Sequence, residues 1–353
     1  MLTRIEFENY RIFKKRQTLE IKPITILFGK NNAGKSAVLK LPSLALSIHH
    51  SKTPDTFDTK YLGVKICEDY RDLVYNKASN AVNIKYQFET AATEVLFHVD
   101  IDNLVVDKFE RTENNEGPIS HLDYIGPFRV QRNLVDLRLE NQTPRWSGID
   151  GVNLYQTLLR DAKTPAHLLC DKVSRWYQDN FEGWGIYVDV SSTSTGDVYN
   201  VVMRNNGITT PIWDCGTGII QSLPIVIRAC KGAEEPTLVV IEEPESHLNP
   251  AAHAGLCQLI VDSTKEDSNK SYLIETHSHT FILRLQRLLA EKKISPDEIA
   301  LYYVNYNEEE RSSELKRIEM MQDGSIPRWP KGMFQDVMKE LVYINQARFG
   351  EIS

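Results

Sequence analysis

The sequence predicts an α/β protein with a mostly parallel sheet, an inserted antiparallel β lobe and a helical lobe. Apolar runs at 24–28, 238–241 and 272–274 each lead into a segment with helical spacing. Such alternation is typical of βαβ units. Short strands with period-two alternation lie between residues 61 and 125, and apolar residues recur at helical spacing over 151–182.

The individual elements are expected in the following order. Alternating apolar residues between Leu2 and Ile21 predict a small antiparallel element before the buried strand at 24–28. A glycine-rich turn and a helix from Lys35 come next. The later elements are strands at 82–88, 94–99, 185–190 and 198–204, a helix ending near 229, a strand at 238–241, a helix at 251–261, a strand at 272–274 and a helix at 281–290.

Four units divide the chain in this prediction. Residues 1–125 form an N-terminal half with the glycine-rich loop and the antiparallel lobe, and residues 126–232 form the helical and strand lobe. Residues 233–305 return to the parallel sheet, and 306–353 form a small cap. No internal repeat, low-complexity tract or sustained heptad pattern is expected.

Composition excludes several classes of protein. With 353 residues, 41% hydrophobic and 25% charged, the chain has enough apolar material for a core. No apolar run is long enough to span a bilayer, and the five cysteines form no C-x-x-C pair, so we expect a cytoplasmic protein without disulfides or a zinc site. The net charge of −7 means that nucleic acid binding would need a local basic patch.

A phosphate-binding loop follows the first buried strand. Residues 29–36 match G-x-x-x-x-G-K-[ST]. Its glycines let successive backbone N–H groups point at phosphate oxygens, while the lysine faces the β and γ phosphates and the serine hydroxyl faces Mg²⁺. The segment predicts a nucleoside triphosphate site with Mg²⁺, with the candidate binding residues Asn31, Asn32, Ala33, Gly34, Lys35 and Ser36.

Two acids end the apolar strand at 238–241. Glu242 and Glu243 follow it directly, and a parallel strand delivers such residues to the crevice where ligands bind. The first acid can belong to the magnesium shell, and the second can orient or deprotonate an attacking water.

From these acids onward the sequence resembles a known family. Residues 242–250, Glu-Glu-Pro-Glu-Ser-His-Leu-Asn-Pro, resemble the fused Walker B and D-loop of ABC-type ATPases of the SMC, RecF and OLD group. Residues 7–13 resemble the N-F-R-x-F segment of that group, and 274–278 its T-H-S switch.

Further segments are similar to stand-alone prokaryotic AAA ATPases of the same group, the kind found in defence operons. Residues 213–225 resemble their degenerate signature segment, and 323–334 their short C-terminal domain of unknown function. Tyr-Ile-Gly-Pro-Phe-Arg at 124–129 shows a weaker likeness to another motif of the set. The implied fold is an ABC-type ATPase head with a helical signature lobe.

The resemblance implies specific roles. In this family two protomers enclose two ATP molecules, each held by the phosphate loop of one chain and the signature segment of the other. Glu242 then belongs to the magnesium shell, Glu243 is the catalytic base and His277 senses the γ-phosphate. Gly216 and Gly218 would close over the nucleotide of the partner protomer.

Several residues keep a second interpretation. Asn249 takes the place of a D-loop aspartate, and Gln87 and Gln131 are both poor candidates for a Q-loop glutamine. The basic cluster 14–16 is either a solvated hairpin face or a DNA contact. The Trp329–Pro330 corner is either a packed cap or a binding site.

Two classes of function remain open. The first is an ATP-hydrolysing homodimeric switch that regulates a separate effector, a nuclease or toxin, in antiviral defence. Only 353 − 277 = 76 residues follow His277, so we expect a bare ATPase head without its own nuclease domain. The second is a DNA-binding ATPase of recombination or repair that resembles the RecF branch. A small-molecule kinase is disfavoured because the Glu-Glu-Pro-Glu block and the T-H-S segment have no role there.

Overall fold

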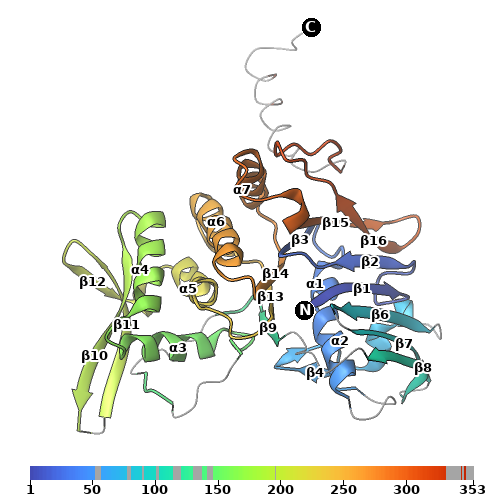
Figure 1. The fold of residues 1–353 in the computed structure, drawn as a ribbon, viewed down its shortest axis with the longest axis horizontal. Coiled ribbons are helices and arrows are strands. Elements are labelled where there is room, and N and C mark those ends of the chain that lie inside the picture. The colour runs from blue at the N-terminus through green and yellow to red at the C-terminus, as the bar shows by residue number, and fades with distance from the viewer. Residues whose placement is uncertain are drawn as a thin grey trace.

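The computed structural model describes residues 1–51, 57–77, 81–89, 91–100, 103–113, 121–129, 137–140, 146–194 and 196–330, together with residues 343 and 346 (Figure 1). A six-stranded sheet forms its centre. The strand order is β16 (Ser312–Ile318), β15 (Ile299–Asn307), β3 (Ile24–Gly29), β14 (Lys270–Glu275), β13 (Thr237–Glu242) and β9 (His121–Ile125). Only β16 runs antiparallel to its neighbour, which confirms the predicted mostly parallel sheet.

The central sheet separates two hydrophobic cores. Alternate residues of its strands point to opposite faces. Ile26 and Ile274 belong to the core shared with α6 (Pro250–Glu266) and α7 (His279–Ala290), whereas Leu27 and Leu273 belong to the core shared with α1 (Lys35–Leu39) and α2 (Leu41–His50). Because both faces of the central sheet are buried, the sequences of these strands are continuous apolar runs.

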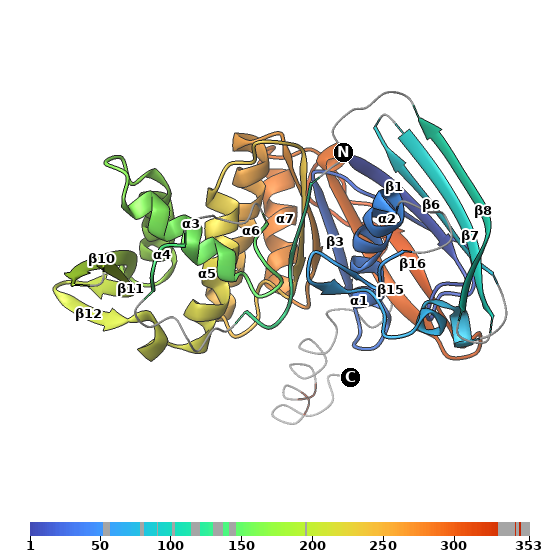
Figure 2. The ribbon, with the colours of Figure 1, turned by 90° about the horizontal axis from the view of Figure 1, so that it is seen from below.

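A five-stranded antiparallel sheet packs on the second core (Figure 2). Its order is β2 (Gln17–Glu20), β1 (Leu2–Glu8), β6 (Val82–Phe88), β7 (Ala91–Asp100) and β8 (Asn103–Glu113). The expectation that this lobe extends to Ile125 is wrong at its end. The strand β9 is buried along most of its length and pairs in parallel with β13, so it belongs to the central sheet.

The second lobe combines helices with a small sheet. Helices α3 (Val152–Ala162), α4 (Leu168–Asn180) and α5 (Thr217–Cys230) lie beside the antiparallel strands β10 (Gly185–Thr193), β11 (Gly196–Asn205) and β12 (Ile208–Pro211) (Figure 1). The helical spacing over 151–182 corresponds to the two helices α3 and α4. The segment that separates them contains Pro165, which removes a backbone donor and restricts the residue before it.

The last described part of the chain extends the central sheet. Strands β15 and β16 form a hairpin, so residues 306–318 of the predicted cap belong to the sheet. The rest of the cap from residue 331 onward, apart from 343 and 346, lies outside the described residues. All five cysteines are free, and within the described ranges no helix is long and apolar enough to cross a bilayer.

Candidate active site

The phosphate loop connects β3 to α1 and needs glycine at both ends for different reasons. A Cβ on Gly29 would lie 2.3 Å from the Val304 carbonyl oxygen of the neighbouring strand. Gly34 has φ of +100°, and a Cβ there would lie 2.7 Å from Ile12 Cδ1. Glycine is required at position 29 because the neighbouring strand packs closely against it. Glycine is required at position 34 because the backbone is left-handed and a side chain lies against it.

Lys35 lies inside the curve of this loop. Its Nζ donates to the carbonyl oxygens of Gly29 (3.1 Å) and Lys30 (2.9 Å), and its side chain is 3% exposed. Burial lowers the pKa of Lys35, although the charge of Glu275, 3.6 Å from Nζ, acts in the opposite direction. The loop thus presents a cation among backbone groups that surround the predicted phosphate position.

Two carboxylates end adjacent strands beside the loop, one half-buried (Glu242) and one buried (Glu275). Glu242 ends β13 and Glu275 ends β14, directly opposite each other in the parallel register. Glu242 accepts a hydrogen bond from the Tyr124 hydroxyl at 2.6 Å, whereas Glu275 accepts one from Ser36 Oγ at 3.0 Å. Burial raises the pKa of both acids, that of Glu275 to about 7.

Glu275 is the site residue that the sequence interpretation missed. The rule that selected Glu242, an acid at the carboxyl end of a buried parallel strand, also selects Glu275. The adjacent Thr-His-Ser segment drew attention to His277 instead. In the structure Glu275, and not Glu242, contacts the serine of the phosphate loop.

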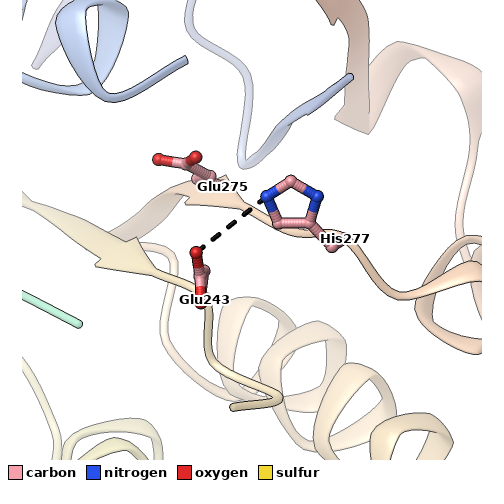
Figure 3. Close-up of side chains that lie close together, drawn as sticks. All are labelled: Glu243, Glu275 and His277. Atoms are coloured by element: carbon pink, nitrogen blue, oxygen red, sulfur yellow. Dashed lines mark ion pairs between the residues drawn. The ribbon is translucent and has the colours of Figure 1, made fainter. Parts of the chain in front are cut away.

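Glu243 projects into the same region from the first residue after β13. Its backbone has φ of +42°, which is uncommon for a residue other than glycine. Ser246 Oγ donates to Glu243 Oε2 at 2.8 Å, and His277 Nε2 lies 3.9 Å from Glu243 Oε1 (Figure 3). Glu243, Glu275 and His277 offer ligand atoms that lie within 4.8 Å of one another.

Hydrogen bonds of its own backbone and of the next residue hold His277 in this cluster. Its backbone N–H donates to Glu245 Oε1 at 2.6 Å, and the following Ser278 caps α7 through Phe281 N–H. Burial and the charge of Lys35 both lower the pKa of His277, so the neutral imidazole predominates at neutral pH. A neutral imidazole can donate one hydrogen bond and accept another.

The signature-like glycines lie on a different element from the phosphate loop. Gly216 precedes α5 and Gly218 lies in its first turn, and α5 packs against α3, α4 and α6. The helix α1 packs instead against α2 and strands of the central sheet. Among the described residues no hydrogen bond or ion pair joins residues 216–218 to the phosphate loop.

Other predicted residues have structural partners. Asn249 caps α6 by accepting from Ala251 N–H at 3.1 Å. Lys15 pairs with Glu310 at 2.7 Å and Arg16 with Glu6, so two cations of the basic cluster are matched by acids.

The remaining sequence candidates lie away from the phosphate loop or outside the described residues. Gln87 lies on β6 in the antiparallel sheet, and Gln131 lies outside the described residues. Trp329 packs against the core that includes residues of α7 and, with Pro330, lines a cavity of about 550 Å³ beside β15 and β16.

A larger cavity of about 830 Å³ adjoins the phosphate-loop helix through Ala37 and Lys40. Cations, acids and two tyrosines line it. The lining residues are Arg11, Ile12, Ala37, Lys40, Lys65, Ile66, Cys67, Glu68, Asp72, Val74, Tyr75, Asn76, Lys77, Tyr306 and Arg311.

The parallel sheet, the phosphate loop and the acids at the ends of adjacent strands have the arrangement of an ABC-type ATPase head fold. Residues 1–120 match a family model described as AAA ATPase domain, and residues 294–344 match one described as protein of unknown function DUF3696. A comparison with curated proteins gave no match.

Solved structures of SMC heads share the fold. One is the SMC head bound to the C-terminal winged-helix domain of ScpA, with 10% identity, a TM-score of 0.56 and coverage of 90% of this chain and 97% of that one. Another is the SMC head of Pyrococcus furiosus bound to the C-terminal domain of ScpA, with 12% identity, a TM-score of 0.57 and coverage of 98% and 99%. The chain therefore has the fold of an SMC head, and its first 120 residues match the AAA ATPase domain model.

Proposed function

We propose that this protein binds and hydrolyses ATP, with Glu243 as the general base for the attacking water. The observation that carries the proposal is the convergence of Lys35, Glu243 and His277 on one edge of the sheet. Phosphoryl transfer depends mainly on positioning and charge stabilisation, so a base held beside a phosphate loop supplies most of what the protein must add.

Each side chain of the site has a separate role in ATP hydrolysis. Lys35 stabilises negative charge on the β and γ phosphates, and the backbone N–H groups of residues 31–34 cradle the same oxygens. Glu243 accepts the proton of the water, with its carboxylate oriented by Ser246. His277 contacts the γ-phosphate as the neutral donor that its lowered pKa favours.

The donor set fits Mg²⁺. Ser36 and the carboxylates of Glu242 and Glu275 are hard oxygen ligands of the kind that this ion prefers. Burial raises the pKa of both acids. The charge of Glu243 raises that of Glu242 further, and the charge of Glu242 raises that of Glu275, so a divalent cation beside these carboxylates would offset their repulsion. When bound, Mg²⁺ neutralises part of the charge on the phosphates. We propose Ser36 and Glu242 as ligands, as the motif resemblance implies, and add Glu275 because of its bond to Ser36.

The cavity beside α1 is the proposed site of the nucleoside. It begins where the phosphate loop ends, and its volume of about 830 Å³ lies in the range of ligand pockets. Tyr75 and Tyr306 offer aromatic surface to a base. Lys40 offers a cation to the ribose or the α-phosphate.

We further propose that two copies close around two ATP molecules. Gly216 and Gly218 lie on α5, apart from the phosphate loop of their own chain, so a second copy is needed to bring them to a nucleotide. The closed dimer would be read by a separate effector, a nuclease or toxin, in antiviral defence. This last step is supported by the resemblance to stand-alone ATPases of defence operons. The related SMC heads were solved in complex with a separate protein, ScpA.

A set of three variants tests the proposal. Glu243→Gln should bind ATP with parental affinity, form dimers by light scattering and lose at least about 100-fold in kcat, because general bases contribute roughly 10²–10⁴. Lys35→Ala should lose ATP binding. Glu309→Gln, in an exposed turn, serves as the control with parental turnover. Parental turnover by Glu243→Gln would show that the base assignment is wrong.

The effector proposal needs its own measurement. Tagged Glu243→Gln protein is recovered from the native host with Mg-ATP present throughout. A stoichiometric protein encoded nearby supports a switch that acts on an effector. Recovery of nucleic acid without a protein partner would contradict it and favour a DNA-binding ATPase.

A further inference from the structure

Arg129 ends the Tyr-Ile-Gly-Pro-Phe-Arg motif and is completely buried, with 0% exposure. Its guanidinium donates to backbone carbonyl oxygens of three segments: Nη1 to Gly126 (2.8 Å) and Glu242 (2.6 Å), Nη2 to Glu243 (2.8 Å) and Nε to Gln221 (3.0 Å). Its backbone N–H also donates to Gln221 Oε1 at 3.1 Å. One side chain thus ties β9, the end of β13 and helix α5 together.

Arg129 is buried although its neighbour in the same loop is exposed. The preceding Phe128 is 86% exposed, so the loop does not bury its apolar side chain. Within the described part of the chain, no carboxylate forms an ion pair with the Arg129 guanidinium. Burying a cation among neutral carbonyls costs stability, and a buried group whose hydrogen bonds are all made holds its neighbours in one geometry.

The geometry fixed here is that of the proposed base. Glu243 has φ of +42°, a left-handed conformation that needs outside support in a residue with a side chain. The backbone is held at both ends: its N–H donates to the Glu275 carbonyl at 2.9 Å, and its carbonyl accepts from Arg129. Removal of the second bond frees the peptide that directs the Glu243 carboxylate.

Arg129 also contacts α5, the signature-like helix, because its Nε and its backbone N–H both donate to Gln221. Gln221 is 3% exposed and lies one turn after Gly218 on α5. A Cβ on Gly218 would lie 2.4 Å from the His247 carbonyl oxygen, so the first turn of α5 also packs on the segment that follows Glu243. A shift of α5 would therefore be transmitted to Glu243 in two ways: through the hydrogen bonds between Arg129 and Gln221, and through the packing of Gly218 on His247.

We infer that Arg129 is a positioning residue that sets the backbone of Glu243 and links it to α5. The inference rests on the proposed ATPase function. In a dimer whose partner nucleotide contacts residues 216–218, this link makes the position of the base depend on the state of α5.

The test compares Arg129→Lys with the parent protein and with Arg228→Lys. Lysine keeps the charge but has one nitrogen with three donors in place of the planar guanidinium, so it cannot replace all four hydrogen bonds to carbonyl groups. Arg228 is also buried, 5% exposed at its side chain, and pairs with Asp123 at the opposite end of α5 from Gly218. It therefore controls for the loss of a buried arginine on the same helix that has no hydrogen bond to Glu243. Melting temperature, ATP affinity, KM and kcat are measured for each protein.

We expect Arg129→Lys to lower kcat at least tenfold with KM and ATP affinity within about threefold of the parent. Arg228→Lys should lower the melting temperature at least as much while its kcat stays near the parental value. In a Glu243→Gln background the Arg129 change should produce little further loss, because residues that act through one group are non-additive.

Three results would overturn the inference: parental kcat in folded Arg129→Lys, a loss of kcat in Arg228→Lys of equal size, or a full additional loss in the Glu243→Gln background. No ATP turnover in the parent protein would refute the proposed function itself. Turnover in the parent together with parental kcat in Arg129→Lys would refute the positioning role alone.

Discussion

Glu275→Gln isolates the cost of holding a charged carboxylate beside the phosphate loop. The side chain of Glu275 is 6% exposed, and its pKa rises from the ordinary 4.5 to about 7, first because burial removes water from the carboxylate. The folded chain therefore holds this proton more tightly than the unfolded chain. The associated stability is fully present below pH 4.5 and is lost as the pH rises to about 7.

The magnitude follows from the size of that shift. A difference of about 2.5 pH units corresponds to about 3 kcal/mol. Glutamine keeps an oxygen that can accept from Ser36 and carries no charge. We expect Glu275→Gln to be more stable than the parent by about 3 kcal/mol at pH 8, with the difference disappearing toward pH 4.5. For a chain of this length that is about 4 °C in melting temperature.

The assay is thermal and urea unfolding of both proteins at pH 5, 6, 7 and 8, with EDTA and without nucleotide. Glu309→Gln, an exposed carboxylate, is the control and should show no pH-dependent difference from the parent. A stability difference between Glu275→Gln and the parent that is equal at pH 5 and pH 8 would refute the reasoning, because the cost would then not come from ionisation.

Three further substitutions have defined outcomes. Arg228→Met leaves Asp123, 2.5 Å from Arg228 Nε, as an uncompensated buried charge and should cost about 3–5 kcal/mol in urea unfolding; a loss below about 1 kcal/mol would contradict this. Gly34→Ala places a side chain against Ile12 on a backbone with φ of +100°. It should weaken ATP binding at least tenfold in a fluorescent-nucleotide titration, and parental affinity would refute the proposed role of the loop geometry. Lys40→Ala removes a cation from the cavity beside α1 and should raise KM for ATP about threefold to tenfold with little change in kcat; an unchanged KM would place the nucleoside elsewhere.

The parallel sheet and the phosphate loop could be predicted because their signals are local. Strands 24–28, 238–241 and 272–274 are continuous apolar runs because both faces of the central sheet are covered. The cradle for phosphate is made from consecutive backbone groups, so eight adjacent residues contain the whole pattern. Glu242 and Glu243 were found in the same way, as acids that directly follow a buried strand.

Element boundaries that depend on distant partners were predicted less well. The strand β9 was assigned to the antiparallel lobe because short strands precede it, but its pairing with β13, more than 100 residues later, places it in the central sheet. The helical spacing over 151–182 continues through the segment around Pro165, although the helix itself does not.

The class of fold, the phosphate loop and the acids that follow it can be predicted from the sequence, because each depends on neighbouring residues. The hydrogen bond from Ser36 to Glu275, across 239 residues, and that from Arg129 to the carbonyl group of Glu243, across 114, are visible only in the folded chain. Such contacts depend on the register between strands and on where a loop crosses the edge of the sheet. No spacing along the chain encodes them, because they form only when the strands and α5 pack together.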